Sequence, residues 1–200
     1  MIQIFFLLPK IQNNKMIRFF DIVISILILI IFLPIISLIS FLILAVDGWP
    51  IIYKQPRVGY MGRQFVIFKF RTMSNKVLQD EKLRLTFLGK ILRKTSLDEL
   101  PQLINVLKKD MSIVGPRPLP EIIEKKINKS FKLKRRKILP GMTGMSQINY
   151  TGKNRKLVDK VSLDMQFIDN YNLINYFKIL LKTPIVLVIR LIKNKSSIIQ

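Results

Sequence analysis

The chain has 200 residues, which suits one domain, and its 34 lysines and arginines against 12 aspartates and glutamates give a formal net charge of +22. Such an excess attracts polyanions, namely nucleic acid, an anionic lipid surface or phosphorylated small molecules. Because cysteine and histidine are absent, disulfides, thiolate zinc sites, cysteine nucleophiles and imidazole catalysis are excluded, and chemistry falls to carboxylates, hydroxyls, lysines or an oxygen-bound metal.

An apolar run from Ile22 to Val46 predicts a membrane segment. At ~1.5 Å per residue it is long enough to span a ~30 Å hydrocarbon core. Pro34, near the middle, kinks or breaks a helix. Cations flank both ends of the run, and such flanks favour the cytoplasm; they are Lys10, Lys15, Arg18, Lys54, Arg57 and Arg63. The residues alone leave two interpretations open, a kinked spanning helix and a re-entrant helix broken at Pro34.

Two strand-like stretches follow, residues 51–55 and 65–71, joined by a turn with two glycines at 58–62. Side chains alternate along a strand, so Lys69 and Arg71 share one face while Phe68 and Phe70 share the other. The two cations either line a binding surface or face solvent.

The remaining pattern is mainly helical, with helices expected at 83–94, 96–108 and 121–137 and loops at 115–118 and 140–144. Residues 176–192 are apolar but carry Lys178, Lys182 and Arg190 and are interrupted by Pro184, so this segment is too charged to span a membrane. It is expected either to lie in the membrane interface with its cations at the headgroups or to pack in the core.

Two adjacent carboxylates, Asp98 and Glu99, form the first candidate site. Ser96 followed three residues later by Glu99 has the pattern of a capping box, which explains both residues by helix initiation alone. Asp98 is left unexplained. An aspartate at a helix N-terminus beside cations stays ionised and can attack phosphorus to form an acyl phosphate. Glu99 is then a candidate ligand for Mg²⁺, which prefers oxygen.

Two loops supply further candidates. Arg117 lies between Pro116 and Pro118, which restrict the backbone around a guanidinium suited to bidentate phosphate binding, although an exposed proline-rich loop has the same pattern. The segment 140–149 combines glycines with hydroxyl and amide groups, and such a backbone can approach a nucleotide closely. It lacks the ending of a P-loop.

In this order the motifs resemble the bacterial sugar transferases of the monotopic polyprenyl-phosphate phosphoglycosyl transferase type. The resemblance runs from about Lys15 to Thr183. The matching stretches are Phe68–Met73, Ser96–Lys108, Asp110–Pro118, Pro140–Gly144 and the Gln55-x-Arg57-x-Gly59 turn. It implies transfer of a sugar 1-phosphate from a UDP-sugar to polyprenyl (undecaprenyl) phosphate with release of UMP, the first membrane step of glycan, capsule or O-antigen synthesis.

The resemblance also implies residue roles. Asp98 becomes the covalent nucleophile, Glu99 is associated with Mg²⁺ beside Asp98, and Arg117 binds donor phosphate. The other expected substrate-binding residues are Lys69, Arg71, Arg93, Pro116, Pro118, Gly141, Thr143, Gly144 and Lys153. The implied anchor is a re-entrant helix, broken at Pro34, on the cytoplasmic face of the bacterial inner membrane.

Several residues depart from the family pattern. Leu33 replaces a serine before the breaking proline, and Lys109 replaces a glycine, which costs up to ~1 kcal/mol if the position is left-handed. Lys153 is expected to substitute for an arginine without its fork geometry. Met145, Asn172 and Tyr176 replace a tryptophan, a serine and an aspartate. These departures bear on donor recognition and leave the carboxylate pair intact.

The sequence therefore predicts a mainly helical α+β protein with a short N-terminal segment (1–18), a re-entrant membrane helix (19–47) and a catalytic domain (48–200) that contains a small β-hairpin and interfacial helices. A UDP-sugar, polyprenyl phosphate and Mg²⁺ are the expected ligands, nucleic acid is not expected, and a homodimer is left open. A membrane-tethered nucleic-acid-binding protein would explain the charge but not the Asp98–Glu99 pair or Arg117. A catalytically degenerate scaffold is the other rival, which the intact pair disfavours.

Overall fold

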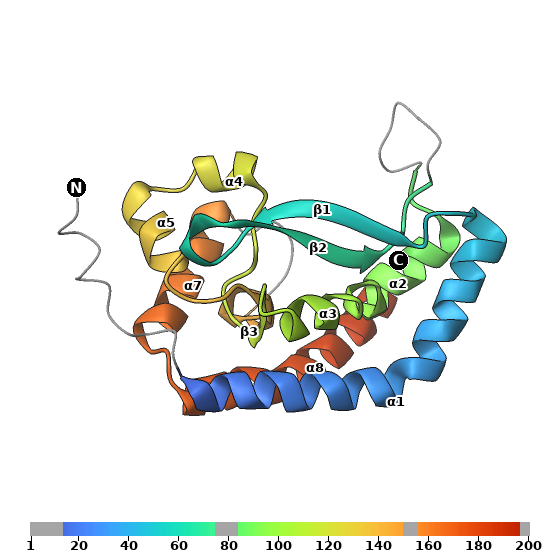
Figure 1. The fold of residues 1–200 in the computed structure, drawn as a ribbon. Helices are drawn as coiled ribbons and strands as arrows, with labels where there is room; N and C mark the ends of the chain where they lie inside the picture. The colour runs from blue at the N-terminus through green and yellow to red at the C-terminus, as the bar shows by residue number, and fades with distance from the viewer. Residues whose placement is uncertain (1–13, 75–83, 150–155, 197–200) are drawn as a thin grey trace.

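A computed structural model describes residues 14–74, 84–149 and 156–196 of the chain (Figure 1). It confirms the mainly helical α+β class with small sheets. The helices are α1 Lys15–Asp47, α2 Phe87–Thr95, α3 Gln102–Leu107, α4 Glu121–Lys125, α5 Lys129–Arg135, α6 Met145–Ile148, α7 Leu157–Asp169 and α8 Leu173–Ser196. The strands are β1 Ile52–Val58, β2 Gln64–Phe70, β3 Ser112–Val114 and β4 Gly141–Thr143, and two 3₁₀ turns, η2 and η3, cover Tyr60–Gly62 and Leu97–Glu99.

The helix α1 is 33 residues long and continues through Pro34. It bends sharply along its length (Figure 1), as expected where a proline removes a hydrogen bond and clashes with the preceding turn. The predicted break is therefore a bend. Among the described residues α1 is the one helix long and apolar enough to cross a membrane. Its side chains at Ile30, Ile31 and Leu33 are at least 60% exposed.

Strands β1 and β2 pair in antiparallel register with Tyr53 opposite Lys69, which confirms the predicted hairpin. The short helix α3 lies between this hairpin and the first part of α1 (Figure 1). Asn105 of α3 is fully buried and holds β2 in place, because its side chain accepts from the Phe68 amide at 3.0 Å and donates to the Val66 carbonyl at 2.8 Å. The strand that carries Lys69 is thus fixed against α3.

A second, parallel pair joins β3 to β4, so the predicted loop at 140–144 is wrong at its centre. The glycine at 141 is what permits the pairing. A Cβ there would lie 2.0 Å from the backbone nitrogen of Gly115, and only glycine allows two backbones to come so close.

The predicted helices differ from the observed ones at their ends. The helix predicted at 83–94 is α2, which begins at Phe87. The Thr86 side chain caps this start, because it accepts a hydrogen bond from the Gly89 amide at 2.9 Å. The helix predicted at 96–108 is a 3₁₀ turn followed by α3. Ser96 is left-handed, with φ 60°, and its side chain makes no cap hydrogen bond, so the predicted capping box is wrong. The helix predicted at 121–137 is divided into α4 and α5, because Asn128 caps a new start.

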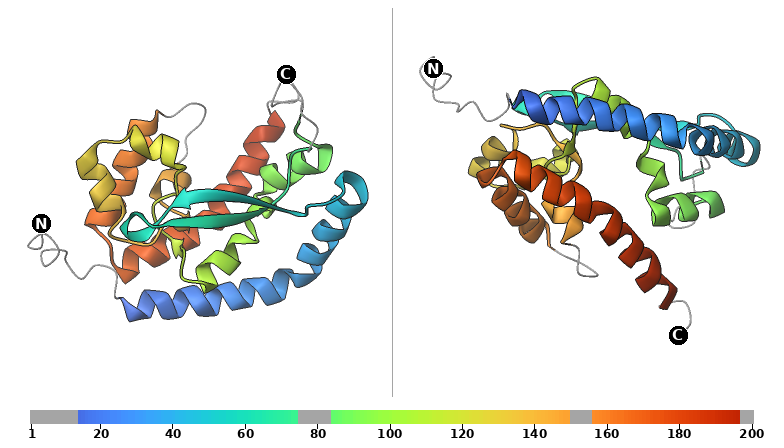
Figure 2. Two further views of the ribbon diagram at one scale, coloured as in Figure 1. Left: turned by 45° about the horizontal axis from the view of Figure 1, so that its top comes forward. Right: turned by 90° about the horizontal axis from the view of Figure 1, so that it is seen from below.

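Helix α8 packs in the core along only part of its length. Tyr176 and Ile179, in its first turns, belong to the main hydrophobic core. Farther along, Leu181, Ile185 and Val188 are more than half exposed. Figure 2 shows α8 beginning beside α1 and then diverging from it. Only the first part of α8 is a core helix.

Polar contacts fasten the first turns of α1 to the rest of the domain. The guanidinium of Arg18 donates to the carbonyls of Val106 and Leu107 at 2.7 and 3.0 Å, at the C-terminus of α3. Asp21 is 1% exposed, and its Oδ1 accepts from the side chain of Ser112 and the amide of Ile113. Arg18, which was predicted to flank a membrane segment, thus binds the C-terminal carbonyls of α3.

Candidate active site

A cleft of about 570 Å³ lies between the hairpin, α2, the 3₁₀ turn at 97–99 and the loop that contains Arg117. We call it the basic cleft. It is lined by Tyr53, Gln55, Arg57, Lys69, Phe70, Arg71, Thr72, Met73, Ser74, Arg84, Arg93, Ser96, Asp98, Glu99 and Arg117. Six of these residues are cations and two are carboxylates, so the cleft suits an anionic ligand.

Asp98 lies at the centre of the 3₁₀ turn and is 8% exposed. No ion pair to it is found among the described residues. Burial, and then the charge of Glu99, raise the pKa of the Asp98 carboxyl to about 6, against the opposing influence of Lys69 and Arg93. The sequence predicted that cations would favour the charged form, but burial outweighs them. The carboxyl is nevertheless roughly nine-tenths ionised at pH 7.

Glu99 is the partner of two cations that come from distant segments. Its Oε1 lies 2.5 Å from the Nζ of Lys69 and 3.6 Å from Nη2 of Arg117. Although burial alone would raise the pKa of Glu99, the charges of Arg117 and Lys69 lower it. The contact with Lys69 explains why Glu99 does not turn back to cap a helix at Ser96. The two carboxylates are adjacent in sequence but differ in their environments.

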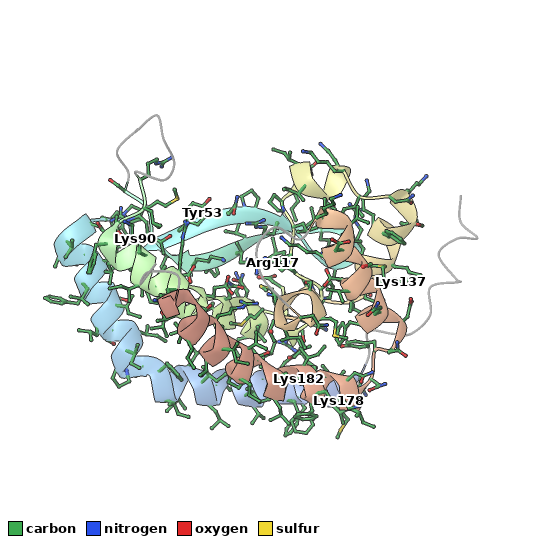
Figure 3. All side chains as sticks on the ribbon, turned by 180° about the vertical axis from the view of Figure 1, so that it is seen from behind. Tyr53, Lys90, Arg117, Lys137, Lys178 and Lys182 are labelled. Carbon is green, nitrogen blue, oxygen red and sulfur yellow. The ribbon has the colours of Figure 1, made fainter. Side chains whose placement is uncertain are left out.

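Several hydrogen bonds hold the loop that carries Arg117. The Gly115 amide donates to the Thr143 carbonyl at 2.9 Å, and the Gly141 amide donates to the Pro116 carbonyl at 3.0 Å. From α5, Arg135 donates to the carbonyl of Arg117 at 2.6 Å. The Arg117 guanidinium itself remains 45% exposed, on a fixed backbone. Tyr53 and Arg117, both labelled in Figure 3, line the same cleft.

Arg135 is in turn held by a buried ion pair. Its Nη1 contacts Oδ2 of Asp164, on α7, and both side chains are at most 7% exposed. Arg135 therefore links α7 to the backbone of the Arg117 loop.

The other predicted cations have specific partners. Arg71 is 4% exposed and donates to the carbonyls of Asp47, Gly48 and Trp49, at the end of α1. Its guanidinium therefore joins the end of α1 to β2 at the edge of the cleft. Arg93 donates through Nε to the Thr72 hydroxyl at 2.9 Å.

The predicted glycine-rich segment does not line the basic cleft. Gly141 and Gly144 both pack against the backbone of Gly115, and the Thr143 hydroxyl is hydrogen-bonded to that of Thr183 at 2.9 Å. These residues support the Arg117 loop from behind. Lys153 lies outside the described residues.

Tyr53, Arg57 and Arg84 are among the cleft residues that the sequence did not predict as site candidates. Tyr53, Gln55 and Arg57 alternate along β1, and Tyr53 pairs directly with Lys69. The same two-residue period that placed Lys69 would have found them. Arg57 approaches Arg117, and burial together with that like charge lowers the pKa of Arg57.

Asp98 and Glu99 are the carboxylates of the cleft, and carboxylate oxygens are ligands that Mg²⁺ accepts. No group of three or more acidic residues is found in the described ranges. Mg²⁺ needs only one or two carboxylates when it keeps its waters and shares substrate phosphates. Asp98 and Glu99 line the same cleft as six cations, which can neutralise bound phosphate. Their donor chemistry fits the ion.

Comparison with known proteins gives a consistent result. The family model described as bacterial sugar transferase matches residues 12–190. The uncharacterized sugar transferase EpsL of Bacillus subtilis is 43% identical over 148 residues, which cover 68% of this chain and 69% of the relative.

Two further relatives carry descriptive names. The undecaprenyl-phosphate galactose phosphotransferase of Salmonella typhimurium is 40% identical, with 88% of this chain and 43% of the relative covered. The UDP-glucose:undecaprenyl-phosphate glucose-1-phosphate transferase of Escherichia coli is 35% identical, with 80% and 37% covered. The chain thus spans less than half the length of these two relatives. Because the family model extends over nearly the whole chain, including the Asp98–Glu99 turn and the Arg117 loop, this protein belongs to the bacterial sugar transferase family.

Proposed function

We propose that this protein transfers a sugar 1-phosphate from a UDP-sugar to a polyprenyl phosphate such as undecaprenyl phosphate and releases UMP, as the first membrane step of polysaccharide synthesis. The names of the Salmonella and Escherichia coli relatives support the reaction class. The observation that carries the proposal is Asp98, a buried carboxylate without an ion-pair partner among the described residues, in a cleft that six cations help to line.

The proposed reaction has two steps. An Asp98 carboxylate oxygen attacks the phosphorus that bears the sugar, an oxygen–phosphorus bond forms, and the bond to the bridging oxygen breaks so that UMP leaves. An oxygen of the acceptor phosphate then attacks the same phosphorus and regenerates the free carboxylate. Neither step needs an imidazole, because phosphoryl transfer depends mainly on positioning and charge neutralisation.

The cations of the cleft would position the donor. Lys69, Arg93 and Arg117 can neutralise the phosphate oxygens, and the fixed backbone of Arg117 limits the ordering that binding requires. Asp98 and Glu99 would hold Mg²⁺, which when bound neutralises charge on the diphosphate. Chelation of divalent ions should therefore abolish UMP release and added Mg²⁺ should restore it. Unchanged turnover after chelation would overturn the metal assignment.

We further propose that α1 is re-entrant and that the protein is monotopic on the cytoplasmic face. Both ends of α1 are attached to one domain, the first turns through Arg18 and Asp21 and the last residues through Arg71. A helix that crossed the bilayer could not place both ends on the same domain. The bend and the exposed apolar side chains between those ends fit insertion into one leaflet.

Topology can be tested with single cysteines, because the chain has none of its own. Met16→Cys and Val46→Cys place thiols at exposed positions near the two ends of α1. In oriented membrane vesicles we expect a membrane-impermeant maleimide to label both from the cytoplasmic side only. Leu33→Cys, beside the bend, should resist labelling from either side. Labelling of position 46 from the outer side would establish a spanning helix.

Activity is tested with purified protein, a panel of UDP-sugars and undecaprenyl phosphate. We expect UMP release with at least one donor, and radiolabel passing from the sugar phosphate to extractable lipid. Denaturation during turnover should trap a phosphosugar adduct on the peptide that contains Asp98, to be found by mass analysis. Transfer without any adduct would refute the covalent route, and no transfer with any donor would refute the reaction.

A further inference from the structure

A second, larger hollow lies on the other side of the hairpin base. It has a volume of about 770 Å³ and lies between the end of α1, the hairpin and α3. We call it the apolar groove. Its lining is Ser40, Trp49, Pro50, Ile51, Ile52, Tyr53, Lys54, Phe68, Arg71, Pro101 and Ile104. Apart from Lys54 and Arg71, no charged side chain of the described residues lines it.

The apolar groove adjoins the basic cleft, because Tyr53 and Arg71 line both. Arg71 is a fixed part of this junction, since its guanidinium donates to three carbonyls at the end of α1. An apolar space thus lies beside an anion-binding space, with Tyr53 and Arg71 at their shared border. A ligand that fills both must carry an anionic head and a hydrocarbon chain.

At its other end the groove reaches the membrane helix. Ser40 belongs to α1 and Trp49 follows it, and the Trp49 side chain is 75% exposed. Tryptophan is enriched at the level of lipid headgroups. Tyr53 and Ile104, on the groove walls, are 47% and 46% exposed. Covering this apolar surface with hydrocarbon is favourable.

We propose that the apolar groove holds the first isoprene units of the acceptor lipid, with the lipid phosphate in the basic cleft beside Asp98. This inference rests on the proposed function, which supplies a polyprenyl phosphate as the ligand. The groove has the volume of a site for a drug-sized molecule. It therefore holds only the part of the chain next to the phosphate, and the remainder stays in the bilayer. The protein then selects its acceptor by the chain as well as by the phosphate.

The first test measures binding and needs no turnover. A polyprenyl phosphate with a photoreactive diazirine on the isoprene unit nearest the phosphate is bound to the whole protein in nanodiscs and illuminated. We expect crosslinks in residues 49–54 and 101–104, and loss of these crosslinks with excess undecaprenyl phosphate. Crosslinks confined to the outward-facing side chains of α1 and α8 would overturn the proposal. Since no donor sugar is present, a failure of the transfer reaction does not affect this result.

The second test compares acceptors. Ile104→Asn makes one wall of the groove polar at a half-exposed position of α3, and Ile122→Asn is the matched control on an exposed position of α4 outside the groove. We expect kcat/KM for undecaprenyl phosphate to fall roughly tenfold in Ile104→Asn. The loss should be smaller for geranyl phosphate, whose short chain occupies less of the groove, and the control should change neither value. Equal losses with both acceptors, or none, would overturn the proposal.

Discussion

Two buried aspartates show how one residue type serves two purposes in this fold. The Oδ1 of Asp21 accepts three hydrogen bonds, from the Ser112 side chain at 3.0 Å, the Ile113 amide at 2.8 Å and the Tyr176 hydroxyl at 2.8 Å. Asp98 is nearly as buried, yet it has no ion-pair partner among the described residues and its nearest acidic neighbour raises its pKa. One carboxylate is satisfied by the fold, whereas the other is left available.

The difference follows from what surrounds each side chain. Donors from β3 and α8 converge on Asp21, so its side chain joins three elements. Of the two cations that act on Asp98, Lys69 contacts Glu99 directly and Arg93 donates to the Thr72 hydroxyl. A carboxylate held in this way costs stability but retains free lone pairs for chemistry, which is the usual trade at an active site.

The sharpest test of this comparison is Asp98→Asn. UMP release should fall by at least about a thousandfold, because the amide is a poor nucleophile. The free energy of unfolding should rise by ~1–3 kcal/mol at pH 7.5, because the variant no longer buries a charge whose pKa is raised to about 6. Assays of UMP release and thermal unfolding in the same detergent measure both effects.

The size of this stability gain depends on pH. A carboxyl whose pKa is raised by folding destabilises the protein above about pH 6, and this effect disappears below the unfolded value near ~4. The gain of Asp98→Asn should therefore shrink as the pH falls toward 4. Asp159→Asn, at an exposed position of α7, should show neither the loss of activity nor the gain. A variant of Asp98 that is inactive and less stable at pH 7.5 would contradict the comparison.

Asp21→Ala should have the opposite outcome. It leaves the donors of Ser112, Ile113 and Tyr176 unpaired in the core, so we expect the free energy of unfolding to fall by about 2–4 kcal/mol. Asp21→Asn keeps one acceptor oxygen and should lose less. The specific activity of the folded fraction should change far less than the stability. Loss of activity in a fully stable Asp21→Ala protein would assign Asp21 to the site instead.

Arg135→Lys tests whether a buried ion pair positions the Arg117 loop. The lysine keeps a charge for Asp164 but lacks the second arm, which donates to the Arg117 carbonyl. We expect the KM for the UDP-sugar to rise about tenfold with a smaller change in kcat, since small displacements of a binding group are costly. Arg136→Lys, whose guanidinium pairs with Glu124 instead, is the matched control. Equal effects of the two substitutions would show that general packing, and not the Arg117 loop, is responsible.

The pH dependence of the first half-reaction tests the ionised form of Asp98. With a pKa of about 6, the nucleophilic form is lost as the pH falls through that value. The kcat/KM for the donor should decrease roughly tenfold between pH 7 and pH 5, because this ratio reports groups of the free enzyme. Variants at the other cleft residues should keep this decrease in kcat/KM at low pH. A decrease centred near pH 4 instead would show that Lys69 and Arg93 outweigh burial in setting the pKa of Asp98.

The sequence predicted the parts of the site that depend on local patterns. The two-residue period placed Lys69 on a strand face, and the proline-flanked Arg117 and the Asp98–Glu99 pair do line one cleft. Ser96 could not be predicted, because the letters of a capping box are the same whether Glu99 turns back to the helix or contacts Lys69 of a distant strand. Strand β4 was not predicted because glycine and proline at 140–144 have the pattern of a turn, and the backbone pairing of Gly141 with Ser112 leaves no mark in the sequence.

Asp21 was missed for a related reason. In the sequence it marks only the border of an apolar run, and its three partners lie 91, 92 and 155 residues away. Tyr176, which departs from the family pattern, is one of them. Contacts over such separations have no local signal, so the buried network that holds α1 becomes visible only in the folded structure.

Lys109→Gly gives the smallest effect and tests a backbone prediction. The sequence predicted a cost if this position is left-handed, and its φ is 67°. Glycine adopts this conformation freely, so the free energy of unfolding should rise by ~0.5–1 kcal/mol with UMP release unchanged. Lys126→Gly, at the exposed end of α4, is the control, because φ is −78° there and glycine should lose a similar amount. Chemical unfolding of the two variants should therefore move in opposite directions, which separates backbone strain at position 109 from the loss of one surface charge that both share.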